Sequence, residues 1–251
     1  HIGNETVFDA EVLDIQWFGK DKNTLLLQTR TGMLHRSTDH GEAWTDVMPK
    51  LQELATAGAP SSPRGTIEAE GPAPLRVGML VRSRADPDIV LALPATGLAA
   101  GLMSSDAGAT WRRIALENRV RSWIFHAIRS EWALTSFWNE FCRRDLVRPE
   151  KPCTHDLYIT KDAGRSFELV ATRVVQFSWG PTESGQQDTI LMTQFRGGEG
   201  HQPRLTRWMT GIDLRQTGDF GQTVTTLLQD GNKFQISNNY ILVVKVLEES
   251  E

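Results

Sequence analysis

Asp156-Leu-Tyr-Ile-Thr160-Lys-Asp162-Ala-Gly164-Arg-Ser166-Phe167 contains the pattern that decides the fold, [Ser/Thr]-x-Asp-x-Gly-x-x-aromatic. The aspartates of the four copies, Asp39, Asp106, Asp162 and Asp219, are 67, 56 and 57 residues apart. A repeat of this period indicates an array of supersecondary units. The four copies are Ser37-Thr-Asp39-His-Gly41-Glu-Ala-Trp44, Ser104-Ser-Asp106-Ala-Gly108-Ala-Thr110-Trp111, Thr160-Lys-Asp162-Ala-Gly164-Arg-Ser166-Phe167 and Thr217-Gly-Asp219-Phe-Gly221-Gln-Thr223-Val224.

Each octet predicts the turn of a β-hairpin, because a strand-like run precedes it and another follows. The Asp carboxylate can accept hydrogen bonds from backbone N–H groups, and the Ser or Thr hydroxyl can do so more weakly. The Gly supplies the positive φ of a tight turn. The aromatic residue begins the next strand and packs inward, and only the fourth copy lacks it, with Val224 in its place. Turn formation explains every position, so none needs a catalytic role.

The octet is the Asp-box of β-propellers, which occurs in sialidases, other glycoside hydrolases and sortilin-type receptors. A cysteine-flanked loop, Cys142 to Cys153, precedes the third box, and the run Val174-Val-Gln-Phe177-Ser-Trp179-Gly180 follows it. This order resembles the N-terminal half of the sortilin receptor domain. The resemblance covers roughly residues 8 to 247 and is strongest over 142–180.

Composition fits a globular protein with a large core: 251 residues, 39% of them hydrophobic and 23% charged. The net charge of −4, with no basic stripe among the 27 Lys and Arg, argues against nucleic-acid binding. No run reaches the ~18 apolar residues of a membrane span. His1 starts without the pattern of a signal peptide, so we expect such a peptide to be removed or to lie upstream.

Two features concern the compartment. Cys142 and Cys153 can close a small loop as a disulfide, or they can be two unrelated buried thiols. The resemblance favours the disulfide, which would place the chain in an oxidising compartment. Asn4-Glu-Thr6 is a single N-glycosylation sequon, consistent with a luminal chain. Neither a CxxC motif nor a His pair at zinc spacing accompanies the cysteines, so we expect no metal and no cofactor.

We predict an all-β chain, 1–251, that forms part of a β-propeller with four-stranded antiparallel blades. The blades span about 8–48, 75–116, 119–171 and 173–229, and a fifth begins at 233–251. Residues 55–74, rich in Gly, Pro, Ala and Ser, are expected to form a flexible insertion loop. The predicted strands are Val12–Trp17, Thr24–Thr29, Gly32–Arg36, Trp44–Val47, Arg76–Ser83, Ile89–Leu93, Gly101–Ser104, Trp111–Ala115, Val120–Phe125, Glu131–Phe137, Asp156–Thr160, Phe167–Val170, Val174–Trp179, Thr189–Gln194, Arg204–Thr210, Val224–Leu228, Phe234–Gln235 and Tyr240–Leu247.

Two further expectations concern particular segments. Lys50–Ala57 and Arg119–Ile128 have some helical spacing, but the β-rich context argues against a helix at either. The continuous apolar run Ile241–Val246 is typical of an innermost strand buried on both faces. The resemblance implies a ten-bladed ring, so four blades and the start of a fifth would leave two blade faces open. We therefore expect a second chain, or the rest of the propeller, to cover those faces.

The main enzymatic alternative is a sialidase-like Asp-box glycoside hydrolase. A sialidase needs three clustered arginines and a Tyr nucleophile supported by Glu. The two tyrosines are Tyr158, which precedes a box, and Tyr240. No nucleophile–base group emerges, so we expect no catalytic residues and no enzyme. A self-contained carbohydrate-binding propeller, with a groove lined by some of the eight tryptophans, is a second alternative.

The resemblance implies the luminal segment of a single-pass sorting receptor of the Golgi and endosomal system. Such a segment would bind protein or peptide cargo and would contact neither nucleic acid nor the membrane. Propellers commonly bind ligands at the central channel, so Val244 and Lys245 are the predicted contacts. His126 and His155 are candidates for pH-dependent release of cargo, and exposed histidines without any such role are the alternative.

Overall fold

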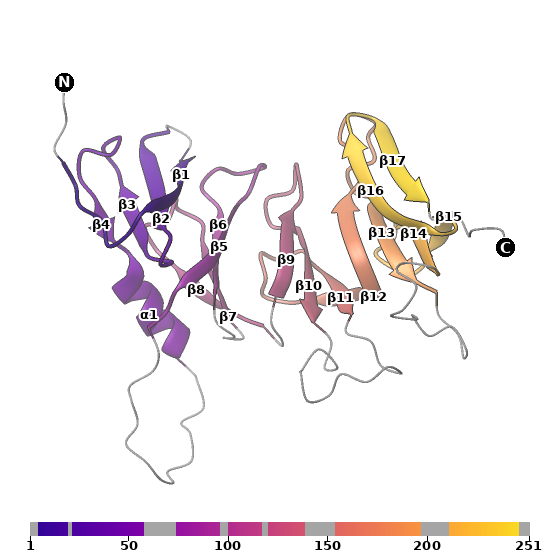
Figure 1. Ribbon diagram of the computed structural model, residues 1–251, viewed down its shortest axis with the longest axis horizontal. Coiled ribbons are helices and arrows are strands. Elements are labelled where there is room, and N and C mark those ends of the chain that lie inside the picture. The colour runs from indigo at the N-terminus through magenta and orange to yellow at the C-terminus, as the bar shows by residue number, and fades with distance from the viewer. Residues whose placement is uncertain are drawn as a thin grey trace, which may run out of the picture. The chain divides into compact units, whose positions relative to one another are not determined.

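The computed structural model describes residues 5–19, 22–57, 74–95, 100–116, 120–138, 154–196 and 211–245. The chain divides into two compact units, residues 1–117 and 118–251, which run from indigo to magenta and from magenta to yellow in Figure 1. Both units consist of antiparallel sheets whose strands pair in chain order. The all-β prediction is therefore confirmed.

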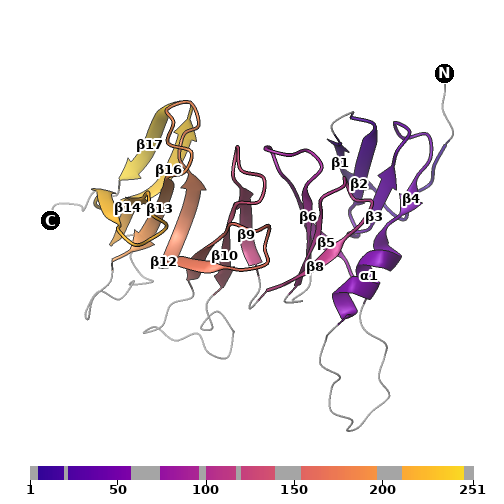
Figure 2. The same cartoon turned by 180° about the vertical axis from the view of Figure 1, so that it is seen from behind.

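The first unit contains two four-stranded sheets. In each sheet, the turn between the last two strands carries an Asp-box octet. One helix follows the first sheet and lies next to β7 and β8 (Figure 2). The strands are β1 (Val12–Phe18), β2 (Thr24–Thr29), β3 (Leu34–Ser37) and β4 (Thr45–Asp46), then β5 (Val77–Arg82), β6 (Val90–Pro94), β7 (Ala100–Ser104) and β8 (Arg112–Ala115); the helix is α1 (Met48–Thr56).

The second unit contains a seven-stranded sheet and a two-stranded hairpin. The seven strands equal two four-stranded blades that share one long strand, because β12 pairs with β11 through its first part and with β13 through its second. The strands are β9 (Val120–Phe125), β10 (Ala133–Trp138), β11 (His155–Thr160), β12 (Glu168–Trp179), β13 (Ile190–Phe195), β14 (Ile212–Thr217) and β15 (Thr225–Leu228), and the hairpin is β16 (Gly231–Ser237) with β17 (Tyr240–Lys245).

A shared β-bulge sets a common register for the first strand of every blade. The pairing shifts by one residue directly after Val12 in β1 and after Val174 in β12. The same shift follows Val77 in β5, Val120 in β9 and Gly231 in β16. A bulge re-aims the side chains that follow it, so its recurrence makes these strands equivalent residue by residue. The hairpin β16–β17 therefore has the register of the first two strands of a blade, with β16 in the place of the first strand.

Apolar side chains fill the space between consecutive sheets within each unit. In the first unit, Phe18, Leu26 and Leu34 face Val90 and Leu102, and α1 adds to the same core. In the second unit, Leu134, Leu157 and Ile159 meet Phe177, Trp179 and Met192, while Leu191 and Leu214 meet Phe234 of the hairpin. Burial between successive sheets is thus what holds each unit together.

The expectation that Lys50–Ala57 avoids a helix is wrong, because α1 spans Met48–Thr56. Asp46 accepts a hydrogen bond from the Met48 N–H at 2.8 Å, and a Pro occupies the first turn, where its missing N–H costs nothing. Met48, Leu51 and Ala55 are buried in the core. Their spacing is one helical stripe, and burial of that stripe outweighs the β-rich context. The other segment with helical spacing forms strand β9, as predicted.

Two strand predictions need correction, and a third lies outside the described residues. Phe167–Val170 and Val174–Trp179 belong to one strand, β12, which passes through Arg173 with a φ of 56°. The strand before the fourth octet is β14 at Ile212–Thr217, whereas the predicted strand Arg204–Thr210 lies outside the described residues. The run from Tyr240 is the second strand of its blade and is mostly exposed, so its predicted burial on both faces is wrong. Residues 58–73 of the expected insertion also lie outside the described residues.

Candidate functional site

The four Asp-box turns share one hydrogen-bond pattern. In the third box, the Thr160 hydroxyl donates to Asp162 Oδ1 at 2.9 Å and accepts from the Gly164 N–H at 2.8 Å. Asp162 Oδ1 also accepts from the Ser166 N–H at 2.9 Å, which closes the turn. Equivalent bonds of 2.7 to 3.0 Å occur in the boxes that begin at Ser37, Ser104 and Thr217.

Two consecutive residues in each box have positive φ. The glycine is one of them, and the residue before it is the other: His40, Ala107, Ala163 and Phe220 have φ between 54° and 61°. Positive φ at both central residues is the condition for a type I′ hairpin turn. The sequence predicted the glycine conformation, but nothing in the varied residues at the preceding position indicated theirs.

Sequence reasoning also missed two recurrent hydrogen bonds. The Ser166 hydroxyl donates to Asp162 Oδ2 at 2.6 Å, and threonines donate in the same way in the second and fourth boxes, whereas the first box has Ala43 there. The Trp44 and Trp111 indoles donate to the glycine carbonyls of their own boxes at 3.1 and 3.0 Å. The sequence contained a signal for the hydroxyl bond, because Ser or Thr occupies the seventh position of the octet in three copies.

The box aspartates act as permanent acceptors. Burial would raise the pKa of Asp162, but hydrogen bonds from Ser166 and Thr160 outweigh it and lower that pKa to about 2. Hydrogen bonds from Thr223 lower the pKa of Asp219 to about 2. A carboxyl group whose pKa lies this far below neutral pH is ionised and cannot serve as a general acid. The chemistry of these residues is therefore turn closure.

The second and fourth boxes also contact the blade that precedes them within their unit. In the first unit, Arg36 Nε donates to the Ala107 carbonyl of the second box at 2.9 Å. In the second unit, a Cβ on Gly221 of the fourth box would lie 2.3 Å from the Val170 carbonyl oxygen of β12. Phe220 of the same box packs edge-on against Trp132, with ring centroids 5.4 Å apart. The turns are therefore part of the blade–blade contact.

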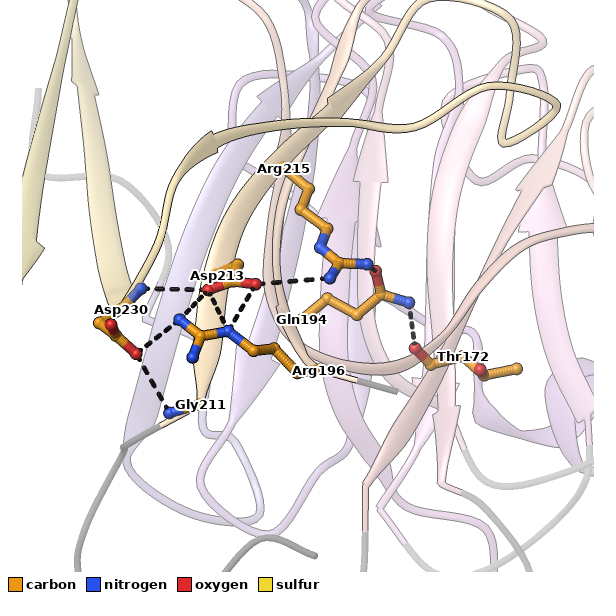
Figure 3. Close-up of polar contacts among 7 residues, drawn as sticks. All are labelled: Thr172, Gln194, Arg196, Gly211, Asp213, Arg215 and Asp230. Carbon is orange, nitrogen blue, oxygen red and sulfur yellow. Dashed lines mark hydrogen bonds and ion pairs between the residues drawn. The ribbon is translucent and has the colours of Figure 1, made fainter. Parts of the chain in front are cut away.

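A polar network at the opposite end of the fourth blade joins β13, β14 and the entry to β16 (Figure 3). Arg196 Nε lies 3.0 Å from both carboxylate oxygens of Asp213, and one terminal nitrogen of Arg196 donates to Asp213 and Asp230, each at 2.7 Å. Arg215 donates to Gln194 Oε1 at 3.0 Å, and Gln194 donates to the Thr172 carbonyl at 2.8 Å.

This network is electrostatically self-contained. Burial alone would raise the pKa of Asp213, whose side chain is 4% exposed, but the Arg196 guanidinium lowers it. Asp213 in turn raises the pKa of Arg196 above its usual value. Two guanidinium groups and two carboxylates balance in charge and bind one another, while Arg215 Nε is buried without a hydrogen-bond partner among the described residues. We assign the network to holding strand ends together rather than to binding a ligand.

The predicted ligand contacts lie on β17. Val244 is 58% exposed, and its pairing partner is Lys233 of β16. The common register makes Val244 equivalent to Gln28 and Thr193, which are 5% and 0% exposed. Val244 therefore lies on the second strand of the hairpin, on a face of the sheet, and not on the first strand. Ligand contact by Val244 and Lys245 stays a prediction. Asn4, Cys142 and Cys153 lie outside the described residues.

The two histidines named for pH sensing are buried. His126 is 0% exposed; its Nδ1 accepts from the Ile128 and Arg129 N–H groups, and its Nε2 lies 3.0 Å from Asp188 Oδ1. His155 stacks edge-on against Trp138. Burial, with the charge of Arg121, lowers the pKa of His155 to about 4. The alternative of simply exposed histidines is therefore excluded for both.

Neither a metal centre nor a membrane span emerges from the described part of the chain. No three of its His, Cys, Asp and Glu side chains cluster as metal ligands. Its helix is too short to cross a membrane.

Among the described residues, Asp156 is the carboxyl whose pKa is raised, because its burial outweighs the hydrogen bond from the Arg173 N–H.

Two solved structures have a fold similar to that of this chain. A GH74 xyloglucanase from Xanthomonas campestris is 19% identical with a TM-score of 0.51, and the match covers 86% of this chain and 30% of the xyloglucanase. An uncharacterised protein from Listeria monocytogenes is 11% identical with a TM-score of 0.51, over 97% of this chain and 61% of that one. At these identities the likeness shows the β-propeller fold alone. The chain spans less than a third of the xyloglucanase.

Sequence comparison with known families is more informative. No curated protein matches the chain at a significant level. The family described as Sortilin, neurotensin receptor 3, matches residues 32–251, which is most of the chain. That range includes all four Asp-box octets and the Val174–Gly180 run on which the resemblance was based. The chain therefore belongs to the Sortilin-Vps10 family.

Proposed function

We propose that this chain is the cargo-binding luminal segment of a transmembrane sorting receptor, which carries proteins from the Golgi to endosomal, vacuolar or secretory organelles. The observation that carries this proposal is the Sortilin-Vps10 match over residues 32–251, which contains the repeated blades. The proposal includes a ten-bladed ring, of which these residues form four blades and the start of a fifth. Protein or peptide cargo is the ligand class.

Deletion of the gene tests the trafficking role. Loss of a sorting receptor should divert its soluble cargo from the receiving organelle into the medium. Quantitative proteomics of the medium and of the organelle fraction should therefore show the same small set of proteins rising in one and falling in the other. Re-expression of the wild-type protein should reverse the change. An unaltered medium and organelle content would contradict the proposal.

Direct binding tests the predicted contact on β17. A diverted protein, once purified, should bind the immobilised luminal protein saturably. Lys245→Ala should weaken that binding if the exposed end of β17 contacts cargo. Lys50→Ala, which removes the same charge from the exposed side of α1, is the matched control. Equal affinities of the two variants would remove Lys245 from the cargo surface.

A glycoside hydrolase is the alternative from another class, favoured by the fold likeness to a GH74 xyloglucanase. Retaining and inverting enzymes use two carboxyl groups about 5–9.5 Å apart, one of them with a raised pKa. Asp156 has the raised pKa, but its hydrogen-bond partner is the Arg173 N–H. We propose that the chain is not an enzyme. Hydrolysis of xyloglucan or of a fluorogenic sialoside, abolished by Asp156→Asn, would overturn this.

A further inference from the structure

The turn between the first two strands is closed in the same way in three blades. The N–H of its first residue donates to the carbonyl of its last residue. This bond joins Ser83 to Ile89 at 3.0 Å, His126 to Trp132 at 2.9 Å and Gly180 to Thr189 at 2.7 Å. Counted back from this closure, Pro87 of the second blade and Gln187 of the fourth have the same place, two residues before the end of their turns.

The carbonyl at this place meets the preceding blade in both units, but through different groups. In the first unit, the Gly19 N–H donates to the Pro87 carbonyl at 3.3 Å. In the second unit, His126 Nε2 lies 2.9 Å from the Gln187 carbonyl oxygen and 3.0 Å from Asp188 Oδ1. An imidazole therefore makes the contact that a backbone amide makes in the first unit. Imidazoles are the side chains that commonly gain a proton between about pH 5 and 8.

The other ring nitrogen of His126 stabilises its own turn. Nδ1 accepts from the Ile128 N–H at 3.1 Å and from the Arg129 N–H at 3.0 Å. In the equivalent turn of the second blade, the Ser83 hydroxyl accepts from the Asp86 N–H at 3.3 Å. Because Nδ1 faces two donors, the ring proton lies on Nε2. Of these two turn acceptors, the imidazole is the one that becomes a donor when it binds a further proton.

The surroundings of His126 give a proton on Nδ1 no partner. The side chain is 0% exposed, and its ring packs edge-on against Trp179 and Trp132, with centroids 4.6 and 5.8 Å away. The charged residues bonded to it are Asp188 of the neighbouring turn and Arg129 of its own, which pair with each other at 3.0 Å. Asp188 attracts a positive ring, but it contacts Nε2 and cannot relieve the two N–H groups at Nδ1. A buried donor that faces donors is costly, so the turn has to open.

Turn 126–132 makes three contacts with the fourth blade. Besides the His126 bond to Gln187, Arg129 pairs with Asp188, and the Trp132 ring packs on Phe220 of the fourth Asp-box at 5.4 Å. The Lys161 ammonium lies over the same Phe220 ring at 4.1 Å. Opening of the turn would therefore move an ion pair and an aromatic contact away from the fourth blade.

We infer that His126 is an acid-sensitive link between the third and fourth blades. The neutral ring closes turn 126–132 and holds it against Gln187 and Asp188, and protonation of Nδ1 opens the turn. The equivalent positions of the first unit use the Gly19 amide and the Ser83 hydroxyl, so that interface stays closed. The inference rests on the geometry of the second unit and does not depend on cargo binding.

Hydrogen exchange of the whole luminal protein tests the link. Each amide is expressed as a protection factor, the exchange rate of an unstructured amide at the same pH divided by the measured rate, so that the intrinsic effect of pH cancels. Between about pH 7.5 and 5.5, protection of the Ile128 and Arg129 amides should fall about tenfold or more. The Asp86 amide, which Ser83 holds in the same way, is the internal control and should change less than about twofold.

His126→Asn separates titration from turn formation. The Asn carbonyl oxygen can accept from the amides two and three residues on but does not titrate, so protection at Ile128 and Arg129 should be equal at both pH values. The comparison with Asp86 in the wild type needs no variant and stands even if His126→Asn fails to fold.

Three results would overturn the inference. Equal protection of the Ile128 and Arg129 amides at both pH values in the wild type would show that the turn does not respond to acid. A parallel fall at Asp86 would show a general loosening of the blades. The same fall in His126→Asn would show that another group, such as Asp188, titrates instead.

Discussion

Replacement of three glycines by alanine separates backbone strain from overlap at the fourth Asp-box. Gly221 has a φ of 98°, and a Cβ there would lie 2.3 Å from the Val170 carbonyl oxygen. Gly211 has a φ of 81° but nothing within 4 Å of the added Cβ. Gly218 has neither the positive φ nor a neighbour within that distance. Gly221→Ala therefore has both backbone strain and steric overlap, Gly211→Ala has backbone strain alone, and Gly218→Ala has neither.

The expected losses in the free energy of unfolding follow from these contacts. An L-residue in the left-handed region costs about 1–2 kcal/mol, which is all that Gly211→Ala should lose. Gly221→Ala should lose a further ~1–3 kcal/mol, because β12 must move away from the new methyl group. The total of about 2–5 kcal/mol is a large part of a typical stability of about 5–15 kcal/mol. Gly218→Ala should stay within about 0.5 kcal/mol of the wild type.

Thermal unfolding followed by tryptophan fluorescence measures the difference. For a chain of this size, a loss of about 3 kcal/mol lowers Tm by roughly 6–12 °C. Gly218→Ala should have the highest Tm of the three variants, Gly211→Ala an intermediate Tm and Gly221→Ala the lowest. Equal Tm values for Gly211→Ala and Gly221→Ala would refute the contact between the fourth box and β12, because strain alone would then explain both.

Three other substitutions test single interactions. Ala43→Thr supplies the hydroxyl that the first box lacks and, by donating to Asp39, should stabilise the protein by about 0.5–1 kcal/mol in urea unfolding; unchanged stability would contradict the shared pattern. Asp213→Asn removes the buried carboxylate that Arg196 binds and should cost about 3 kcal/mol by the same assay, and a loss under ~1 kcal/mol would show that the network contributes little. His155 stays neutral in the folded protein because its pKa is about 4 rather than 6.5, so its contribution to the free energy of unfolding is complete above pH 6.5 and is lost as the pH falls to 4. His155→Gln should therefore flatten the dependence of Tm on pH between 4 and 6.5. Parallel pH profiles of the variant and the wild type would contradict the lowered pKa.

The blade architecture was predictable because its determinants are local in sequence. Each octet contains the donor, the acceptor and the glycine of its turn within eight residues, and the flanking strands begin within a few residues of the turn. The position of a strand within a blade was less predictable. The run from Tyr240 is as apolar as a buried strand, yet β16 takes the inner place, since the bulge after Gly231 marks the first strand.

The polar network was out of reach of the sequence for a physical reason. Arg196, Asp213 and Asp230 are separated by 17 residues at each step and meet only because β13, β14 and the entry to β16 are neighbours in space. Helix α1 was a different kind of miss. Its signals were local, with Asp46 before a Pro in the first turn and an apolar stripe at helical spacing, but the expectation of continuous β-structure overrode them.

The fourth Asp-box shows which positions of the octet can change. Its Asp219 and Gly221 keep their bonds because each satisfies a turn, and Gly221 also fits against β12. The aromatic position covers the turn from one side only, so Val224 can replace it and lie 40% exposed. An aromatic ring appears instead at Phe220, where it packs on Trp132 and lies 4.1 Å from the Lys161 ammonium. The fourth copy thus makes its aromatic contact with the preceding blade, and the hydrogen bonds of Thr217 and Asp219 close its turn without the ring that the other three copies have.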